Sequence, residues 1–173
     1  MSQYRLEAGI PPVSLADIEA GVNDATAEHT LGDTIQFDLG KMFVYVQVVD
    51  SPTTLGSGTG ASNGAVMTHA SATDPFIVTC DRSGGSAIVA GGVSAKAMGV
   101  AQGDVTTNYY TWIQVRGFCD YVRTDGNVEA GKAMAVSAVD EEASIRATIE
   151  DNFGTSLVAD GSDATTAAFL YCW

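Results

Sequence analysis

The chain of 173 residues has few basic residues: eight lysines and arginines stand against 21 acidic residues, which gives a formal net charge of −13 at pH 7. Proteins bind nucleic acid largely by neutralising its phosphates with lysine and arginine, and anionic membrane surfaces attract the same residues. We therefore expect neither nucleic acid nor a membrane as a partner. Only 17% of the residues are charged. The acidity thus comes from a shortage of basic residues, and it favours solubility and contact with protein.

Long apolar runs are also missing. No segment approaches the roughly 18 to 20 residues that a membrane-spanning helix needs. The N-terminus carries the basic residue Arg5, but the apolar stretch of a signal peptide does not follow it. These features predict a soluble protein that is not exported through a cleaved leader. Because 46% of the residues are hydrophobic, the chain is able to bury a core, and its length suits one ordinary domain.

Cysteine and proline are scarce, with three and four residues respectively. Cys80, Cys119 and Cys172 have neither the paired close spacing of a zinc site nor the even number and density of a disulfide framework. We interpret all three as small buried apolar residues. The many glycine, alanine, serine and threonine residues favour short strands joined by tight turns over long helices.

Residues 1–30 differ from the rest and predict an extended N-terminal arm that contains one short helix. Ser14 is placed to cap this helix, and Leu15, Ile18 and Val22 fall on one helical face. So short a helix is marginal by itself and must dock on something. The arm either straps onto its own domain or reaches a neighbouring subunit, and the sequence leaves both open. We expect the remaining domain, residues 31–173, to fold without it.

From Thr34 onward the apolar residues alternate with a period of two, which predicts strands. The clearest strand is Met42–Val49, and Tyr109–Gly117 continues into Phe118–Arg123 through a glycine where a bend or bulge is easy. Further predicted strands are Phe76–Cys80, Ala87–Ala90, Lys96–Ala101, Lys132–Ala138, Ser144–Glu150, Ser156–Ala159 and Ala167–Trp173. This pattern predicts an all-β domain, an antiparallel β-sandwich or barrel of jelly-roll or β-tulip-like form.

No enzyme motif occurs in the sequence context that its chemistry needs. The glycine-rich stretch Leu55–Gly64 lacks the lysine and the following helix of a phosphate-binding loop. Its last five residues, Gly60–Gly64, match the letters Gly-x-Ser-x-Gly, but they belong to a predicted flexible loop and not to the strand–turn–helix of a serine hydrolase. His29 and His69 have no second ligand at metal-binding spacing. We interpret Asp140–Glu142 as a solvated turn rather than a glycosidase pair, and Asp160–Asp163 lacks the remaining ligands of a calcium loop. We predict no catalytic residues, no cofactor and no metal.

Aromatic residues point to an interface instead. Tyr109, Tyr110 and Trp112 gather at the start of one predicted strand, and the chain ends on an apolar run that closes with Trp173. Such a run must be buried in its own sheet or against a partner, and the sequence leaves open which. The candidate interface residues are Leu15, Ile18, Val22, Tyr109, Tyr110, Trp112 and Trp173.

Two stretches carry a resemblance to a known family. The first contains Gly99–Ala101, Tyr110–Gln114 and Gly117, and the second contains Val128 and Ala130–Gly131. These motifs resemble the "GVA … G-Y-x-W-I/V-Q … G" strand pair and the following "V … A-G" of the head decoration, or cement, proteins of tailed bacteriophages. The resemblance covers about residues 30 to 173. It departs from the family pattern at Thr111, where a glycine often stands, and in an added glycine-rich loop.

The resemblance implies a structural virion protein that is made in the host cytoplasm. Such proteins bind the outer capsid surface as homotrimers and cement neighbouring subunits of the major capsid protein. The implied partners are therefore the major capsid protein and further copies of this chain. Two alternatives stay open: a tail or connector component of a phage particle, and a carbohydrate-binding β-sandwich that stacks sugars on Tyr109, Tyr110 or Trp112. A third is a β-fold hydrolase that uses pairs of acidic residues.

Overall fold

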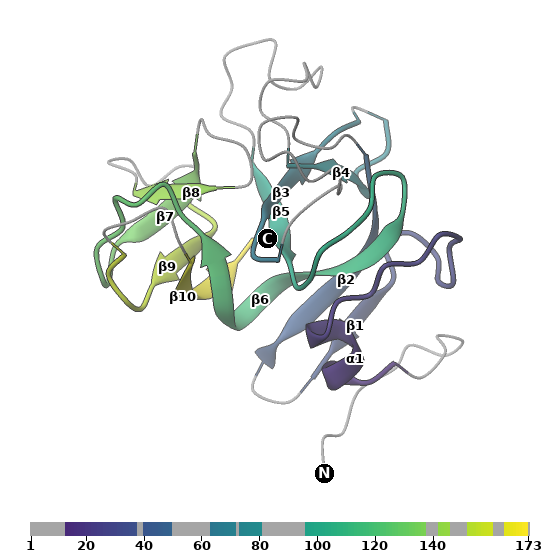
Figure 1. Cartoon of the computed structure of the whole chain (residues 1–173), viewed down its shortest axis with the longest axis horizontal. Helices are drawn as coiled ribbons and strands as arrows, with labels where there is room; N and C mark the ends of the chain where they lie inside the picture. Colours follow the sequence, from purple (N-terminus) through teal and green to yellow (C-terminus); the bar gives the residue numbers. More distant parts are fainter. Residues whose placement is uncertain are drawn as a thin grey trace.

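The computed structural model describes residues 13–37, 40–49, 63–71, 73–80, 96–137, 142–145, 152–160 and 165–172. Over these ranges the chain is mostly β structure, with one short helix near the N-terminus (Figure 1). The elements are α1 (Leu15–Glu19), β1 (Thr34–Gln36), β2 (Met42–Val48), β3 (Val66–His69), β4 (Ile77–Thr79), β5 (Ala97–Ala101), β6 (Tyr110–Arg123), β7 (Ala133–Val136), β8 (Ala143–Ile145), β9 (Gly154–Ser156) and β10 (Thr165–Tyr171). The predicted all-β class is confirmed.

Five strands close into a barrel. Their hydrogen-bonded order is β2-β4-β3-β5-β6, and β6 pairs back with β2 to complete the ring. Every pair is antiparallel except β2 with β4, where Gln47 lies opposite Ile77 in parallel register. One buried cluster, which includes Val44, Val46 and Ile113, fills the barrel. These positions follow from the sequence alternation, because every second residue of a strand faces the same side of a sheet.

The longest strand, β6, connects the barrel to a second group of strands. Its first half pairs with β2 and β5, and its second half pairs with β10, which leads through β9 and β7 to β8. Figure 1 shows the two groups on either side of a sharp bend in β6. Gly117, the predicted bend, has a φ of +91°, in the left-handed region that favours glycine. A second buried cluster, with Met134, Phe153 and Leu170, lies among these strands.

The segment before β1 packs on the outside of the barrel. Ile18 of α1 lies in a third buried cluster with Tyr45 and Trp112, which alternate along their strands with residues of the barrel core. Leu15 and Val22 pack at the margin of this cluster. The outward-facing side chains of Phe43, Tyr45 and Trp112 are therefore covered by the N-terminal segment rather than by solvent.

Local and long-range hydrogen bonds fix this segment in place. The predicted cap is confirmed, because Ser14 and the residue at position N3 of α1 form a complete capping box. Asn23 and Thr106 exchange hydrogen bonds of 3.0 and 3.1 Å, and the Tyr45 hydroxyl donates to the Asp24 carboxylate at 2.9 Å. Of the two alternatives for the arm, the described part of it straps onto its own domain.

The strand predictions succeed where the alternation is clear and fail where it is not. β2, β4, β5, β6, β7 and β10 fall within the predicted ranges or extend them slightly. β3 is not predicted, because its four residues follow directly on the glycine-rich stretch and are too few to display a period. β9 begins before its predicted start. The predicted strand Ala87–Ala90 lies outside the described residues.

Candidate interaction surface

The structure places two of the predicted interface residues in the interior. Ile18 and Trp112 are each 1% exposed, so neither side chain offers a surface to a partner, and the prediction is wrong for both. The physical reason is that the arm and the outer side of the barrel bury each other. Leu15, Val22 and Tyr110 remain partly exposed beside them.

The three aromatic residues predicted to gather at the start of β6, Tyr109, Tyr110 and Trp112, lie in different environments. Tyr109 is half-buried against the barrel core. Tyr110 is stacked on Tyr45, with ring centroids 6.1 Å apart and planes at 13°. With Trp112 buried as well, these three side chains do not form an open platform for sugar rings. Trp173 lies outside the described residues.

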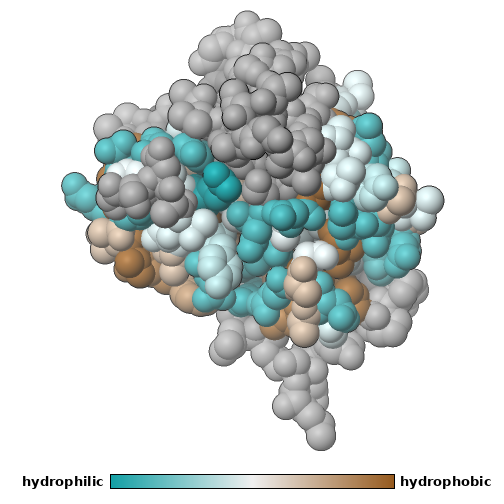
Figure 2. Space-filling model, viewed as in Figure 1, coloured by the Kyte–Doolittle hydropathy of each residue, from teal (hydrophilic) through white to brown (hydrophobic). Residues whose placement is uncertain are grey.

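A different set of side chains forms an exposed apolar surface on the second group of strands. Among the described residues, the exposed large hydrophobic side chains are Phe118 (39%), Tyr121 (54%), Leu157 (46%), Val158 (56%), Phe169 (47%) and Tyr171 (40%). All six lie on β6, on β10 or directly after β9, and we call them the apolar sheet face. Figure 2 shows hydrophobic surface at the lower left of the molecule, where Figure 1 places β9 and β10.

Strand pairing places side chains of the apolar sheet face in neighbouring rows across β6, β10 and β9. Phe118 lies opposite Phe169 across β6 and β10, and Phe169 lies opposite Thr155 of β9. In the adjacent row Arg116 lies opposite Tyr171. Directly opposite side chains of an antiparallel pair have Cβ atoms roughly 4.5 to 5.5 Å apart. The two phenylalanines therefore form one continuous apolar centre rather than two isolated exposed rings.

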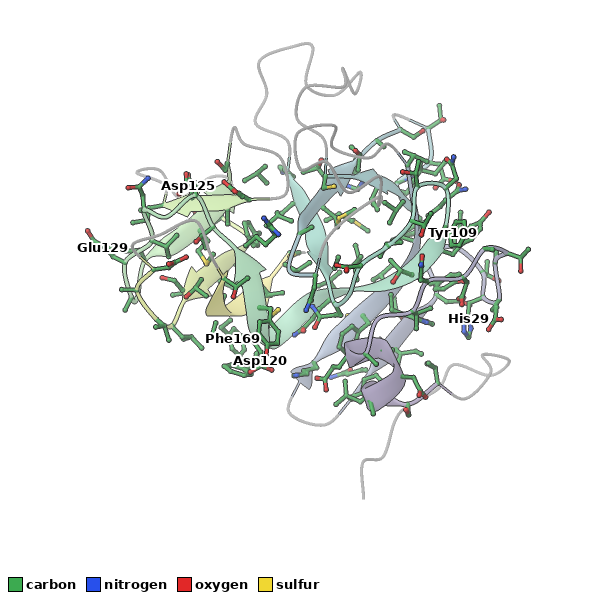
Figure 3. The ribbon with its side chains drawn as sticks, viewed as in Figure 1. His29, Tyr109, Asp120, Asp125, Glu129 and Phe169 are labelled. Carbon is green, nitrogen blue, oxygen red and sulfur yellow. The ribbon has the colours of Figure 1, made fainter. Side chains whose placement is uncertain are left out.

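A bulge in β6 adds a further aromatic side chain to this face. The register between β6 and β10 shifts around Ala167, so that Asp120 and Tyr121 together lie opposite one residue. Both are exposed, whereas in a regular strand one of them would face the core. Figure 3 shows Asp120 close to Phe169 at the bend of β6. Reasoning from alternation alone misses Tyr121, because a bulge leaves no mark on the sequence pattern.

Opposite charges flank the aromatic centre along β6. Arg116 and Asp120 lie on either side of Phe118, and all three are exposed on the same side of the strand. The Lys41 ammonium lies 2.5 Å from Glu19 of α1 and 3.9 Å from Asp120. No ion pair joins Arg116 to any other described residue. Arg116 therefore presents its charge outward at the edge of the apolar sheet face.

The cysteines contribute packing rather than chemistry. Cys80 and Cys119 are buried, as predicted, whereas Cys172 is only partly buried and departs from the prediction. All three are free thiols. Burial raises the pKa of Cys119, and burial together with the neighbouring Cys119 raises the pKa of Cys172 to about 12. Because the thiolate is the nucleophilic form, the raised pKa values lower the reactivity of these two thiols at neutral pH.

The described ranges contain no cluster of three or more His, Cys, Asp or Glu side chains able to hold a metal ion. Nor does a helix long and apolar enough to cross a membrane occur in that part of the chain. Comparisons with models of protein families, with curated proteins and with solved structures find no match to this chain. The geometry itself therefore defines the class: an all-β protein with a closed five-stranded barrel, a second group of strands and an exposed apolar face.

Proposed function

We propose that this chain is a structural virion protein that binds the outer surface of a phage capsid as a homotrimer and cements neighbouring major capsid subunits. The observation that carries the proposal is the apolar sheet face, where six large hydrophobic side chains are 39 to 56% exposed. Contiguous apolar surface of this kind marks sites of contact with other proteins. The motif resemblance supplies the kinds of protein that such a chain contacts, which are further copies of itself and the major capsid protein.

The motifs that carry the resemblance lie at positions where this fold restricts the choice of residue. Gly99 belongs to β5 and Gln114 to β6, and the two strands are paired. A Cβ atom on Gly99 would lie 2.8 Å from the backbone oxygen of Gln114, so a glycine is needed for this close approach. Gly117 provides the bend. The resemblance therefore concerns residues that shape the barrel, which supports a shared architecture for this chain and the decoration proteins.

A cement protein needs contact surfaces rather than a catalytic centre. Three modest contacts on one rigid trimer hold far more tightly than one contact, because the second and third become intramolecular. The rotational symmetry of a closed trimer also fits a local three-fold position in a shell. A net charge of −13 keeps the unassembled chain soluble and disfavours contact with packaged DNA.

Quantitative mass spectrometry of purified virus particles that carry this gene tests the proposal. We expect a copy number close to that of the major capsid protein. A handful of copies per particle would place the chain in a tail or connector instead. If the chain is missing from the particles, the proposal is wrong.

Carbohydrate binding is a second candidate, because Phe118, Tyr121, Phe169 and Tyr171 present aromatic rings on an exposed sheet face. These are different residues from the three predicted for sugar stacking. A glycan array probed with the wild-type chain and with Tyr171→Ala tests this candidate. Binding that Tyr171→Ala abolishes would support it, and an array without signal would remove it.

A further inference from the structure

Building on the proposed function, we infer that the apolar sheet face is the surface through which copies of this chain bind one another, with Arg116 of one copy paired to Asp120 of the next. The occupant of the face is thus a second copy of the same chain. The inference rests on the arrangement of charge around the aromatic centre and on the charge balance of the strands that carry it.

The apolar sheet face is self-complementary. Identical copies around a rotation axis present the same surface to the axis, so a patch that lies on the axis must supply both partners of each contact. Arg116 and Asp120 lie on the same side of β6 with Phe118 between them. Four residues of a straight strand span about 13 Å, and the bend at Gly117 brings the two charges closer than this. Around a rotation axis, the arginine of each copy therefore meets the aspartate of its neighbour while the aromatic centres pack together.

Charge balance also favours contact between copies through this face. Two chains that each carry a net charge of −13 repel one another over most of their surfaces. The strands of the apolar sheet face are different: β6 contains Arg116, Asp120 and Arg123 as charged residues, and β9 and β10 contain none. Their net charge is 2 − 1 = +1. These strands thus lack the negative charge that the chain as a whole carries, which favours the approach of a second copy through them.

The face is also preorganised for such a contact. The Tyr171 hydroxyl donates to the backbone oxygen of Gly154 at 3.0 Å and lies 3.3 Å from the Thr155 hydroxyl. The ring is therefore held in place before any partner arrives, which lowers the entropy lost on association. Arg116 has no ion-pair partner among the described residues, and Lys41 lies as far as 3.9 Å from Asp120. Asp120 is therefore able to accept two hydrogen bonds from an arginine of the next copy.

Charge reversal tests the pairing by light scattering coupled to size-exclusion chromatography. We expect the wild-type chain to elute as three copies of 17.9 kDa. Arg116→Glu and Asp120→Arg each place like charges together at every interface, and we expect each to weaken association by at least tenfold. The double variant Arg116→Glu/Asp120→Arg restores the pair with its signs exchanged and is expected to return to the wild-type mass.

Lys132→Glu is the matched control. It makes the same change of charge at a side chain that is 54% exposed and whose contact, at 3.8 Å, is with Glu129 of its own chain. We expect this variant to keep the wild-type mass. Phe169→Glu, which places a charge in the aromatic centre, is expected to give monomers, with circular dichroism to verify that the fold is retained.

Failure of this inference is distinguishable from failure of the proposed function. A wild-type trimer that Arg116→Glu and Phe169→Glu leave intact would overturn this surface as the contact between copies. Single reversals that dissociate the trimer without rescue by the double variant would overturn the ion pair. A wild-type chain that is monomeric at every concentration would overturn self-association through this face. In each case the copy number in virus particles decides separately whether the cement function stands.

Discussion

Gly117 is restricted both in backbone conformation and in space. Its φ of +91° lies in the left-handed region. A Cβ atom there would lie 2.8 Å from the backbone oxygen of Gly40 and 2.9 Å from the Cα and nitrogen of Lys41. These are backbone atoms, which cannot rotate aside as the end of a flexible side chain can. The turn between β1 and β2 therefore lies directly against the bend that leads β6 out of the barrel.

Replacing this glycine tests how far the bend depends on it. We expect Gly117→Ala to lower the free energy of unfolding by more than about 2 kcal/mol, since left-handed strain of about 1–2 kcal/mol adds to the steric overlap. Gly131→Ala is the control, because Gly131 has a φ of +77° but no atom within 4 Å of the added Cβ. We expect Gly131→Ala to lower the free energy of unfolding, measured by urea denaturation, by only about 1 kcal/mol. Equal losses would show that space at Gly117 is not limiting.

Three weakly acidic side chains, Cys119, Cys172 and Tyr45, make stability depend on alkaline pH. Burial raises the pKa of Cys172 from 9.0 to about 12, and burial and the neighbouring Asp24 raise the pKa of Tyr45 above its ordinary value of 10.0. The folded state therefore holds these protons more tightly than the unfolded chain does. This contribution to stability is fully present below the unfolded pKa values and is lost as pH rises through the folded ones.

We accordingly expect the free energy of unfolding to fall as pH rises above about 9, by at most about 1.4 kcal/mol per pH unit for each group. Urea denaturation at a series of pH values measures the slope. Tyr45→Phe removes one of the groups and makes the decline above pH 10 shallower, at the cost of the hydrogen bond to Asp24 at all pH values. Parallel curves for the two proteins would contradict the role of Tyr45.

At the scale of elements, α1 packs against the outside of the barrel as part of its fold and is not a detachable arm. The helix has only five residues, so its stability comes from packing and not from its own hydrogen bonds. It covers Phe43, Tyr45 and Trp112, which are at most 1% exposed. The contacts therefore lead us to expect that residues 31–173 do not fold stably alone, in contrast to the expectation from the sequence.

Ile18 is the position at which to test this coupling. We expect Ile18→Ala to lower the free energy of unfolding by about 2–5 kcal/mol, the range for a buried aliphatic side chain cut back to alanine. Ala16→Gln, at an exposed position of the same helix, is expected to change it by less than about 0.5 kcal/mol. Thermal denaturation followed by circular dichroism measures both. An Ile18→Ala variant as stable as the wild type would show that α1 contributes little to the fold.

At the scale of the whole molecule, β6 makes the barrel and the second group of strands parts of one structure. Both groups hydrogen-bond to the same strand. Cys172, directly after β10, packs against the barrel core and against the second core. Neither group is therefore able to unfold without removing partners from the other.

One cooperative unfolding transition follows from this sharing. We expect tryptophan fluorescence, which reports on the surroundings of Trp112 and Trp173, and far-ultraviolet circular dichroism, which reports on all strands, to give the same midpoint in urea. If the chain is a trimer, the midpoint also rises with protein concentration. Two separated transitions would show that the second group of strands unfolds by itself.

The sequence by itself determined the features that depend on near neighbours along the chain. Alternation with a period of two predicted most strands and the all-β class, the capping box of Ser14 located the helix, and the glycine at position 117 located the bend. These signals come from residues that are close together in the sequence, so they can be recognised without knowing the fold. The parallel pairing of β2 with β4 and the bulge beside Tyr121 depend on segments distant in sequence, and they were not predictable in this way.

Only the tertiary structure decided which outward-facing residues are covered. Trp112 and Phe118 lie on the same strand, and each alternates with core residues in the same manner. The first is buried because the N-terminal segment packs over it, and the second is exposed because none of the described segments does so. The alternation of apolar and polar residues indicates that a side chain faces outward from its own sheet. Whether solvent, a distant segment or another molecule meets it there is set by the packing of the whole chain, and that placed the candidate interface on Phe118 and Phe169.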